Sequence, residues 1–146
     1  MDTKIILFFH TMATITWVGG MIFLALLSSE VEKLGPQFGA VMGRMTKIFS
    51  KLSVLSILIL IITGIWLTAL HGGTERVQSD WVLKLKHIIF LLAVTNGVLI
   101  GAKIVPNMEK YAAEKSPKVL VWRKRLKTHS LVNLILGILI VLLAIL

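Results

Sequence analysis

The 146-residue chain contains no cysteine, and it has little acidic charge, with seven Asp and Glu residues against 16 Lys and Arg residues. The lack of cysteine excludes disulfides, thiolate metal sites and cysteine nucleophiles. The glycine pairs Gly19-Gly20 and Gly72-Gly73 lack the spacing of a phosphate-binding loop. No nucleophile–base–acid set is visible within the apolar stretches. Hydrolytic catalysis is therefore not expected.

Apolar residues dominate the composition. They make up 56% of the chain, and the mean hydropathy is +0.88. A soluble domain is about 45–50% apolar, and a chain this short has no core large enough to hide the excess. The net charge is +9, and the basic residues flank the apolar runs. This placement favours membrane lipid over nucleic acid as the partner. The composition predicts an integral membrane protein.

Four apolar stretches meet or approach the roughly 20 residues that a membrane-spanning helix needs. They cover about residues 5–27, 52–70, 81–104 and 126–146. The first stretch is longer than the apolar region of about 7–15 residues that is typical of a cleaved signal. The sequence therefore predicts a single all-α transmembrane domain over residues 1–146, built as an up-down bundle of four helices.

The basic residues divide unevenly between the two ends of such a bundle. Lys4, Arg76, Lys84 and Lys86 lie at the end that holds both termini. The other twelve lie in or beside the two connections around residues 28–51 and 103–127. The positive-inside bias therefore predicts that these connections face the cytoplasm and that both termini face outward. We expect a multi-pass protein of the plasma membrane.

Three connections carry turn signals. Gly35-Pro36 follows the first stretch, His71-Gly72-Gly73 ends the second, and Ser116-Pro117 precedes the fourth. The segment over residues 110–127 is rich in lysine and arginine, and it predicts an amphipathic helix that lies on the membrane surface.

Each predicted span carries one histidine, and ionisable residues in spans usually face the interior of the bundle. His10 lies six residues after Lys4, and His87 lies six residues after Trp81. At a rise of ~1.5 Å per residue, each is expected about 9 Å along its helix from the outer end. The other two lie at helix ends, His71 on the outer side and His129 on the cytoplasmic side.

Two imidazoles at one level suit bis-histidine ligation of a haem b iron. His10 and His87 are the predicted ligands, with His71 as a substitute. Residues on the same helical faces are expected to contact the cofactor: Thr14, Trp17, Lys84 and Gly97. A plainer interpretation remains for each feature. Gly97, with Gly101, fits close helix packing, and an interfacial histidine fits a headgroup contact.

Three motifs resemble a broad family of small membrane proteins. The first is Phe9-His10 followed by Ile-Thr-Trp-Val-Gly-Gly at residues 15–20. The second is Arg44 leading into Thr-Gly-Ile-Trp-Leu at residues 63–67, and the third is Trp-Val-Leu-Lys-Leu-Lys at residues 81–86. Their order and spacing resemble the family that includes the CopD-type copper-resistance membrane domain and the HemJ-type protoporphyrinogen oxidase. The resemblance covers roughly the first two-thirds of the chain.

The resemblance implies roles for individual residues. In HemJ-type proteins a first-helix histidine and a third-helix lysine are the functional pair, and haem b is bound. By resemblance the histidine is His10 and the lysine is Lys84 or Lys86; Lys84 shares the face of His87. HemJ-type proteins carry Pro-Arg and a further histidine where the first helix ends. This chain has Leu-Ala-Leu-Leu-Ser-Ser at residues 24–29, so the resemblance reaches the wider family rather than that enzyme.

Three functions follow as hypotheses. The first is a haem-b-binding redox protein that exchanges electrons with a quinone or a porphyrin-type reductant; if it is an enzyme, it is an oxidoreductase. The second is copper handling, as the CopD resemblance implies, although only Met42 and Met45 cluster among the thioether ligands that Cu(I) prefers. The third is a non-catalytic subunit, in a homo-oligomer or a larger membrane complex.

Overall fold

The structure, a computed structural model, describes residues 2–34 and 39–145, and it divides into two compact units, Met1–Trp81 and Val82–Leu146. Each unit is a helical hairpin, and we call them the first and second hairpins. All elements in the described ranges are helices, which confirms the predicted all-α class. The turn expected at Gly35-Pro36 lies outside the described residues.

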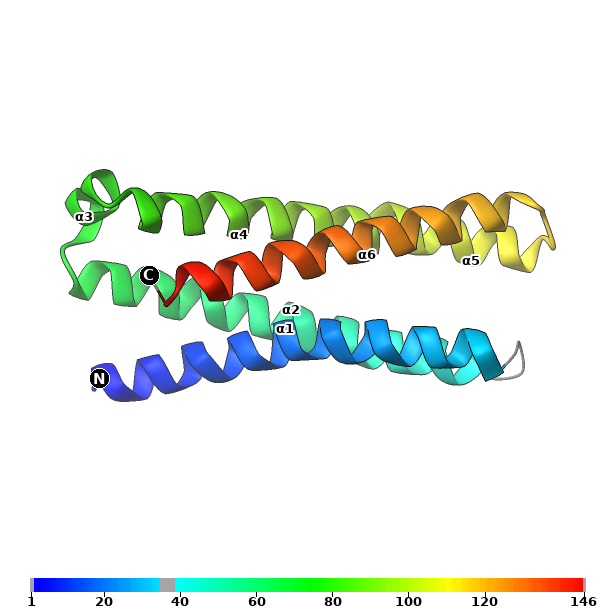
Figure 1. Ribbon diagram of the computed structural model, residues 1–146, viewed down its shortest axis with the longest axis horizontal. Coiled ribbons are helices and arrows are strands. Elements are labelled where there is room, and N and C mark those ends of the chain that lie inside the picture. The colour runs from blue at the N-terminus through cyan, green and yellow to red at the C-terminus, as the bar shows by residue number, and fades with distance from the viewer. Residues whose placement is uncertain (1, 35–38, 146) are drawn as a thin grey trace. The chain divides into compact units, whose positions relative to one another are not determined.

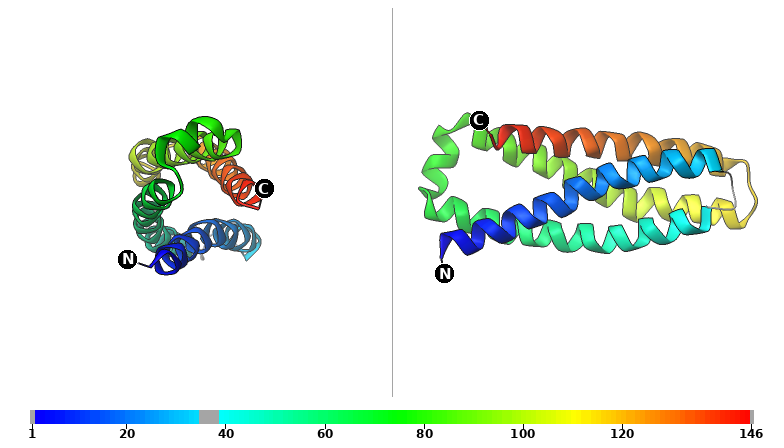
Figure 2. Two further views of the ribbon diagram at one scale, coloured as in Figure 1. Left: turned by 90° about the vertical axis from the view of Figure 1, so that its left-hand side faces the viewer. Right: turned by 60° about the horizontal axis from the view of Figure 1, so that its bottom comes forward.

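The first hairpin pairs α1 (Thr3–Leu34) with α2 (Gly39–Leu70), which lie side by side in Figures 1 and 2. As α1 runs from His10 to Gly20, its neighbours on α2 run back from Thr63 to Phe49, so the two helices are antiparallel. Gly20 permits a close contact with α2, because a Cβ at this position would overlap the ring of Phe49.

Two glycines end α2 and begin the short helix α3 (Gly73–Ser79). Gly72 has a φ of +108° and Gly73 a φ of +58°, a region that costs residues with a Cβ free energy. Before them, the backbone N–H of His71 donates to the carbonyl of Thr68. The helix end predicted at His71-Gly72-Gly73 is therefore confirmed.

The second hairpin consists of one interrupted rod and one long helix. The rod runs through α4 (Trp81–Leu99), the π-helical turn η2 (Ile100–Ile104) and α5 (Val105–Ala113). It lies beside α6 (Lys118–Leu143), as Figures 1 and 2 show.

The chain reverses direction between α5 and α6. Lys115 adopts a φ of 51°, and the backbone N–H of Ser116 donates to the carbonyl of Tyr111. This reversal confirms the turn expected at Ser116-Pro117. It also shows that the single surface helix expected over residues 110–127 is wrong, because the two halves of that segment belong to different, antiparallel helices.

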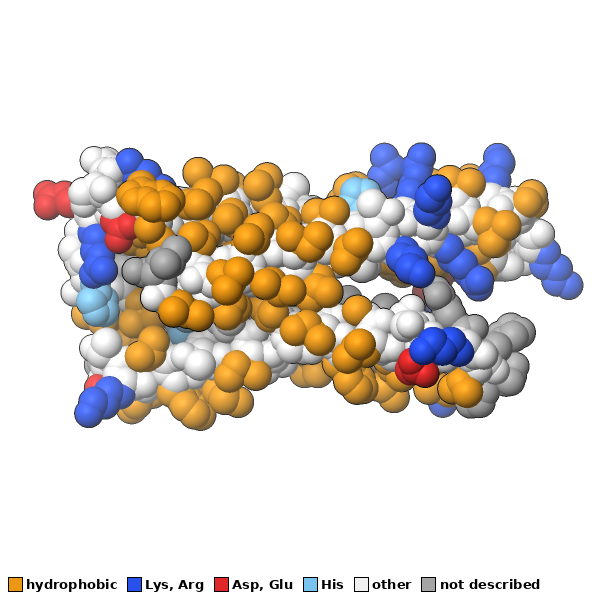
Figure 3. Space-filling view, viewed as in Figure 1, with side chains coloured by type: hydrophobic (Ala, Val, Ile, Leu, Met, Phe, Trp, Pro, Cys, Tyr) orange, Lys and Arg blue, Asp and Glu red, His pale blue; other side chains and the backbone are white. Residues whose placement is uncertain are grey.

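Among the described residues, four helices are long and apolar enough to cross a membrane: Thr3–Val31, Val41–Leu70, Trp81–Ala113 and Lys118–Leu143. Their mean hydropathies lie between 1.7 and 2.4. On the face shown in Figure 3, hydrophobic side chains cover the middle of the helices, and basic side chains gather where α5 and α6 meet. The four-helix transmembrane class is therefore confirmed.

The helices extend beyond the apolar stretches that predicted them. α1 and α2 each have 32 residues, which is about 48 Å at ~1.5 Å per residue, against a hydrocarbon core of about 30 Å. The last turns of α1 are polar and carry an ion pair between Lys33 and Glu30, at 2.6 Å. Backbone hydrogen bonding continues in the interface, so charged residues that end an apolar run do not end the helix.

Candidate functional site

His10 makes a hydrogen bond between the two helices of the first hairpin. Its Nδ1 lies 2.8 Å from Thr63 Oγ1 on α2. Thr63 Oγ1 also lies 2.6 Å from the carbonyl oxygen of Ile59, which can only accept. A hydroxyl has one proton, so Thr63 donates to Ile59 and accepts from His10 Nδ1–H. In the neutral ring this leaves the lone pair of Nε2 free to bind a metal.

His10 has a backbone contact on its own helix and a small residue, Gly64 on α2, beside its ring. The side chain is half-buried, and Thr63 is buried. Thr14 Oγ1 donates to the carbonyl of His10 at 2.9 Å, so Thr14 contacts the backbone of His10. Gly64 lies beside the ring: a Cβ added there would lie 3.8 Å from His10 Cε1. Trp17, two turns further along α1, is 2% exposed.

His71, directly after α2, and His87, on α4, are each held by a simpler bond to the carbonyl four residues earlier. His71 Nδ1 lies 2.7 Å from the carbonyl of Leu67, and His87 Nδ1 lies 2.7 Å from the carbonyl of Leu83. A carbonyl only accepts, so both rings carry the proton on Nδ1 and leave Nε2 free. Both side chains are exposed. Unlike His10, neither ring depends on a neighbouring helix for its orientation.

In the second hairpin, a polar cluster joins α4 to α6. Asn96 Nδ2 donates to the carbonyl of His129 at 2.9 Å and to Asn133 Oδ1 at 3.0 Å. The first of these bonds fixes the amide orientation, so Asn96 Oδ1 accepts from His129 Nδ1–H at 2.6 Å. Asn133 is 7% exposed. Buried side-chain amides that pair in this way hold helices together where water is absent.

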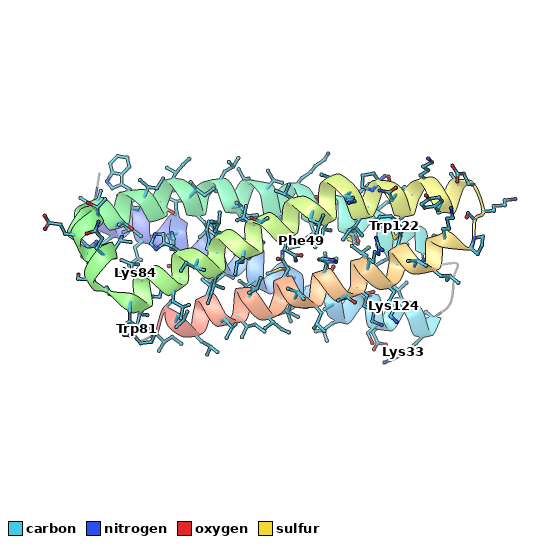
Figure 4. All side chains as sticks on the ribbon, turned by 90° about the horizontal axis from the view of Figure 1, so that it is seen from above. Lys33, Phe49, Trp81, Lys84, Trp122 and Lys124 are labelled. Atoms are coloured by element: carbon cyan, nitrogen blue, oxygen red, sulfur yellow. The ribbon has the colours of Figure 1, made fainter. Side chains whose placement is uncertain are left out.

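The remaining predicted residues lie on α4. Lys84 is exposed on its first turns, near Trp81 (Figure 4), while Lys86 is partly covered. A Cβ added to Gly97 would lie 3.6 Å from Asn133 Nδ2, an ordinary packing distance. Gly97 therefore faces Asn133 on α6, with room for a Cβ between them. Its role beside a cofactor stays a prediction.

Thr63 and Asn96 are functional-site residues that the sequence did not predict. Thr63 begins the Thr-Gly-Ile-Trp-Leu motif, but its position on α2 does not reveal that it meets His10. Asn96 is a side-chain amide within an apolar span, and that feature alone marks it as an interhelical contact. Within each hairpin, no three His, Asp or Glu side chains of the described residues come together as a ready-made metal cluster.

Comparisons with known proteins place these features in a family. A family model described as copper resistance protein D matches residues 43–146, which include α4, η2, α5 and α6 and most of α2. A protein of Aquifex aeolicus (strain VF5) that is described as uncharacterized is 30% identical over 140 residues, covering 94% of this chain and 90% of that protein. No solved structure gives a significant match. The chain is a multi-pass membrane protein and belongs to the copper resistance protein D family.

Proposed function

We propose that this protein handles copper in the membrane and that His10 binds the metal through Nε2. The observation that carries the proposal is the bond from His10 Nδ1–H to Thr63 Oγ1. Metal-ligating histidines almost always donate their second ring N–H to an oxygen, which fixes the tautomer and orients the ring. His10 and His71 both have this arrangement in the first hairpin, and of the two, the His10 ring is half-buried and bonded to another helix. The match of residues 43–146 to the copper resistance protein D family supports copper as the metal.

The donor set limits the form in which copper is bound. Imidazole nitrogen suits copper, zinc, iron and nickel, whereas Cu(I) prefers thiolate and thioether sulfur. The chain has no cysteine, and its six methionines include Met42 and Met45 on α2. An imidazole-based site therefore favours Cu(II), or Cu(I) held by few ligands on its way across the membrane. Copper is the cargo in this proposal.

Haem b is the second candidate, and the state of two rings favours it. His10 and His87 both carry the proton on Nδ1, so both offer Nε2 as an axial ligand. In this proposal Trp17 and Thr14 lie beside the ligand on α1, Gly97 provides room for the macrocycle, and Lys84 pairs with a propionate. A bound haem would supply one-electron transfer, with a quinone or a porphyrin-type compound as the partner. His71 is the substitute ligand.

Metal analysis together with an absorption spectrum separates these candidates. The full-length protein is purified from cells supplied with both copper and haem. We expect about one copper per chain and no Soret band, with copper lost in His10→Ala and kept in His71→Ala. The exposed His71 is the matched control, because its ring bonds to a carbonyl four residues earlier in the chain and to no other helix.

Each other outcome has a definite meaning. Iron with a Soret band, lost in both His10→Ala and His87→Ala, replaces copper handling with the haem proposal. A protein that carries neither copper nor iron contradicts both, and it leaves the non-catalytic subunit as the remaining hypothesis. Copper that survives in His10→Ala removes His10 as the ligand.

Thr63 is a positioning residue in either candidate. Thr63→Val removes the acceptor for His10 Nδ1–H while keeping the shape of the side chain. Loss of such a partner typically lowers metal affinity about 10–100-fold. Thr16→Val is the control, because Thr16 Oγ1 donates only within α1, to the carbonyl of Met12. Equal affinities in the two variants would show that the Thr63 bond does not position the ligand.

A further inference from the structure

A small pocket opens in the second hairpin between its interrupted rod and α6. Six residues line it: Leu99, Lys103, Ile104, Trp122, Arg125 and His129. Its volume is about 190 Å³. Ligand pockets for drug-sized molecules are about 300–1,000 Å³, so this one fits a small group rather than a large ligand.

The polar side chains of the pocket are basic. Lys103 and Arg125 contribute an ammonium and a guanidinium, and neither is paired with a carboxylate in the parts of the chain that the structure describes. The guanidinium of Arg125 lies 4.7 Å from the centre of the Trp122 ring. Such stacking holds the guanidinium plane in place while its N–H groups at the edge remain able to donate.

His129 joins the pocket to the polar cluster. The bond from its Nδ1–H to Asn96 Oδ1 fixes the ring, and the same ring lines the pocket. Nε2 is then the ring atom that remains for a further hydrogen bond or a proton. The pocket therefore combines a guanidinium that stacks on Trp122, the ammonium of Lys103 and an imidazole whose ring is fixed by Asn96.

The local backbone of the rod explains how Lys103 comes to this position. Pro106 has no N–H, and its ring clashes with the carbonyl four residues earlier in a regular helix. The chain accommodates it with the π-helical turn η2, Ile100–Ile104, directly before α5. Ile104 is 2% exposed, while the adjacent Lys103 is exposed. Single π-helical turns of this kind occur frequently at functional sites.

From the helix length, we expect the pocket at the level of a membrane interface. Lys103 follows Trp81, at the start of α4, by about 33 Å of helix, and the hydrocarbon core is about 30 Å thick. It lies at the basic end of the second hairpin, which the positive-inside bias assigns to the cytoplasm. Leu99 and Ile104 add apolar lining on the same pocket.

We propose that this pocket binds the phosphate group of an anionic phospholipid from the cytoplasmic leaflet. Lys103 and Arg125 would donate charge-assisted hydrogen bonds to the phosphate oxygens. Leu99, which is 37% exposed, would contact the first part of an acyl chain. Basic pockets between transmembrane helices on the cytoplasmic side are suited to anionic headgroups, whose surface potential draws cations to this level. The site is independent of the metal proposed in the first hairpin.

The test compares two double variants that lose the same charge from the same end of the protein. One is Lys103→Gln with Arg125→Gln, inside the pocket. The control is Arg123→Gln with Lys124→Gln; both residues are exposed on α6 and neither lines the pocket, and Figure 4 labels Lys124 and Trp122. Full-length proteins are placed in nanodiscs of phosphatidylglycerol and phosphatidylcholine, and the retained lipids are counted by native mass spectrometry.

We expect wild type and control to retain phosphatidylglycerol selectively. In the pocket variant, the ratio of retained phosphatidylglycerol to phosphatidylcholine should fall at least about tenfold further than in the control. Only the pocket variant loses the direct hydrogen bonds to phosphate. Equal losses in the two variants would overturn the pocket and leave only a diffuse basic surface. Circular dichroism checks that both variants keep their helix content.

A second arm separates lipid from free phosphate. Wild type in pure phosphatidylcholine nanodiscs is titrated with inorganic phosphate, and the tryptophan fluorescence is compared with that of Trp122→Phe. The proposal expects no response at millimolar phosphate. A Trp122-dependent response, together with no preference for phosphatidylglycerol, would overturn the lipid assignment in favour of a soluble anion.

Discussion

Each hairpin pairs two antiparallel helices, but the polar contacts between its two helices differ from those in the other hairpin. In the first, one imidazole on α1 donates to one hydroxyl on α2, between His10 and Thr63. In the second, Asn96 uses both amide hydrogens and its oxygen to bind His129 and Asn133 on α6. The first contact leaves Nε2 of His10 free, and Gly64 lies beside the same ring. The second satisfies the Asn96 amide and connects it to a basic pocket.

The contact in the first hairpin prepares a ring for chemistry, whereas the contacts in the second hairpin stabilise the pair of helices. Hydrogen bonds between helices in a membrane contribute about 0.6 kcal/mol each on average, so a single bond adds little to stability. The single bond of His10 is better explained by the tautomer that it selects. The three bonds of Asn96 add up to a substantial contribution, and they explain why a polar amide is tolerated within an apolar helix. Three experiments, in order of decreasing expected effect, and a final NMR measurement test this account of the two hairpins.

The largest expected effect concerns which end of each hairpin faces the cytoplasm. The chain has no cysteine, so a single introduced cysteine reports its own exposure without background. Thr74→Cys lies in α3 of the first hairpin, and Glu114→Cys lies in the turn of the second. We expect a membrane-impermeant maleimide to label intact cells at residue 74 only, and residue 114 only after lysis. The reverse pattern would place the basic pocket outside the cell.

The second effect concerns the polar cluster of the second hairpin. Asn96→Ala leaves His129 and Asn133 without their partner on α4, and it should lower the free energy of unfolding by roughly 2 kcal/mol, about three times the average bond. Thr95→Ala is the matched control, since its hydroxyl donates only to Leu91 of the same helix. Thermal unfolding in detergent measures both. Equal stabilities would mean that the cluster does not hold α4 to α6.

The smallest effect concerns helix packing in the first hairpin, where two adjacent glycines differ. A Cβ at Gly20 would overlap the ring of Phe49, whereas a Cβ at Gly19 meets nothing within 4 Å. Figure 4 labels Phe49, on α2. Overpacking costs about 1–3 kcal/mol, and replacing a helical glycine with alanine returns about 1 kcal/mol. We expect Gly20→Ala to destabilise the protein and Gly19→Ala to stabilise it slightly. Identical unfolding temperatures would contradict the observed approach of α1 to α2.

Much of the fold was predictable from the sequence because lipid imposes simple rules. Four apolar runs predicted four helices, and Gly72 predicted the end of α2. The helix bounds were less predictable, since the last turns of α1 remain helical outside the hydrocarbon core. The surface helix over residues 110–127 was wrong because charge and amphipathicity do not reveal a reversal at Lys115.

The candidate site was only partly predictable. Helical spacing placed His10 on a face with Thr14 and Trp17, but it could not identify the partner on α2. That partner, Thr63, depends on the register between two helices, which is set by packing such as that of Gly20 against Phe49. The matching depth of His10 and His87, one in each hairpin, stays a prediction.

The central claim is that Thr63 holds His10 with its proton on Nδ1 and its Nε2 open to a metal. Nitrogen NMR of the full-length protein with isotope-labelled histidine tests it directly, because the two ring nitrogens give separate signals, and the His10 signals are identified by their loss in His10→Ala. We expect the metal-free protein to carry the proton on Nδ1 and copper to perturb Nε2. A proton found on Nε2, or copper bound at Nδ1, would contradict the account.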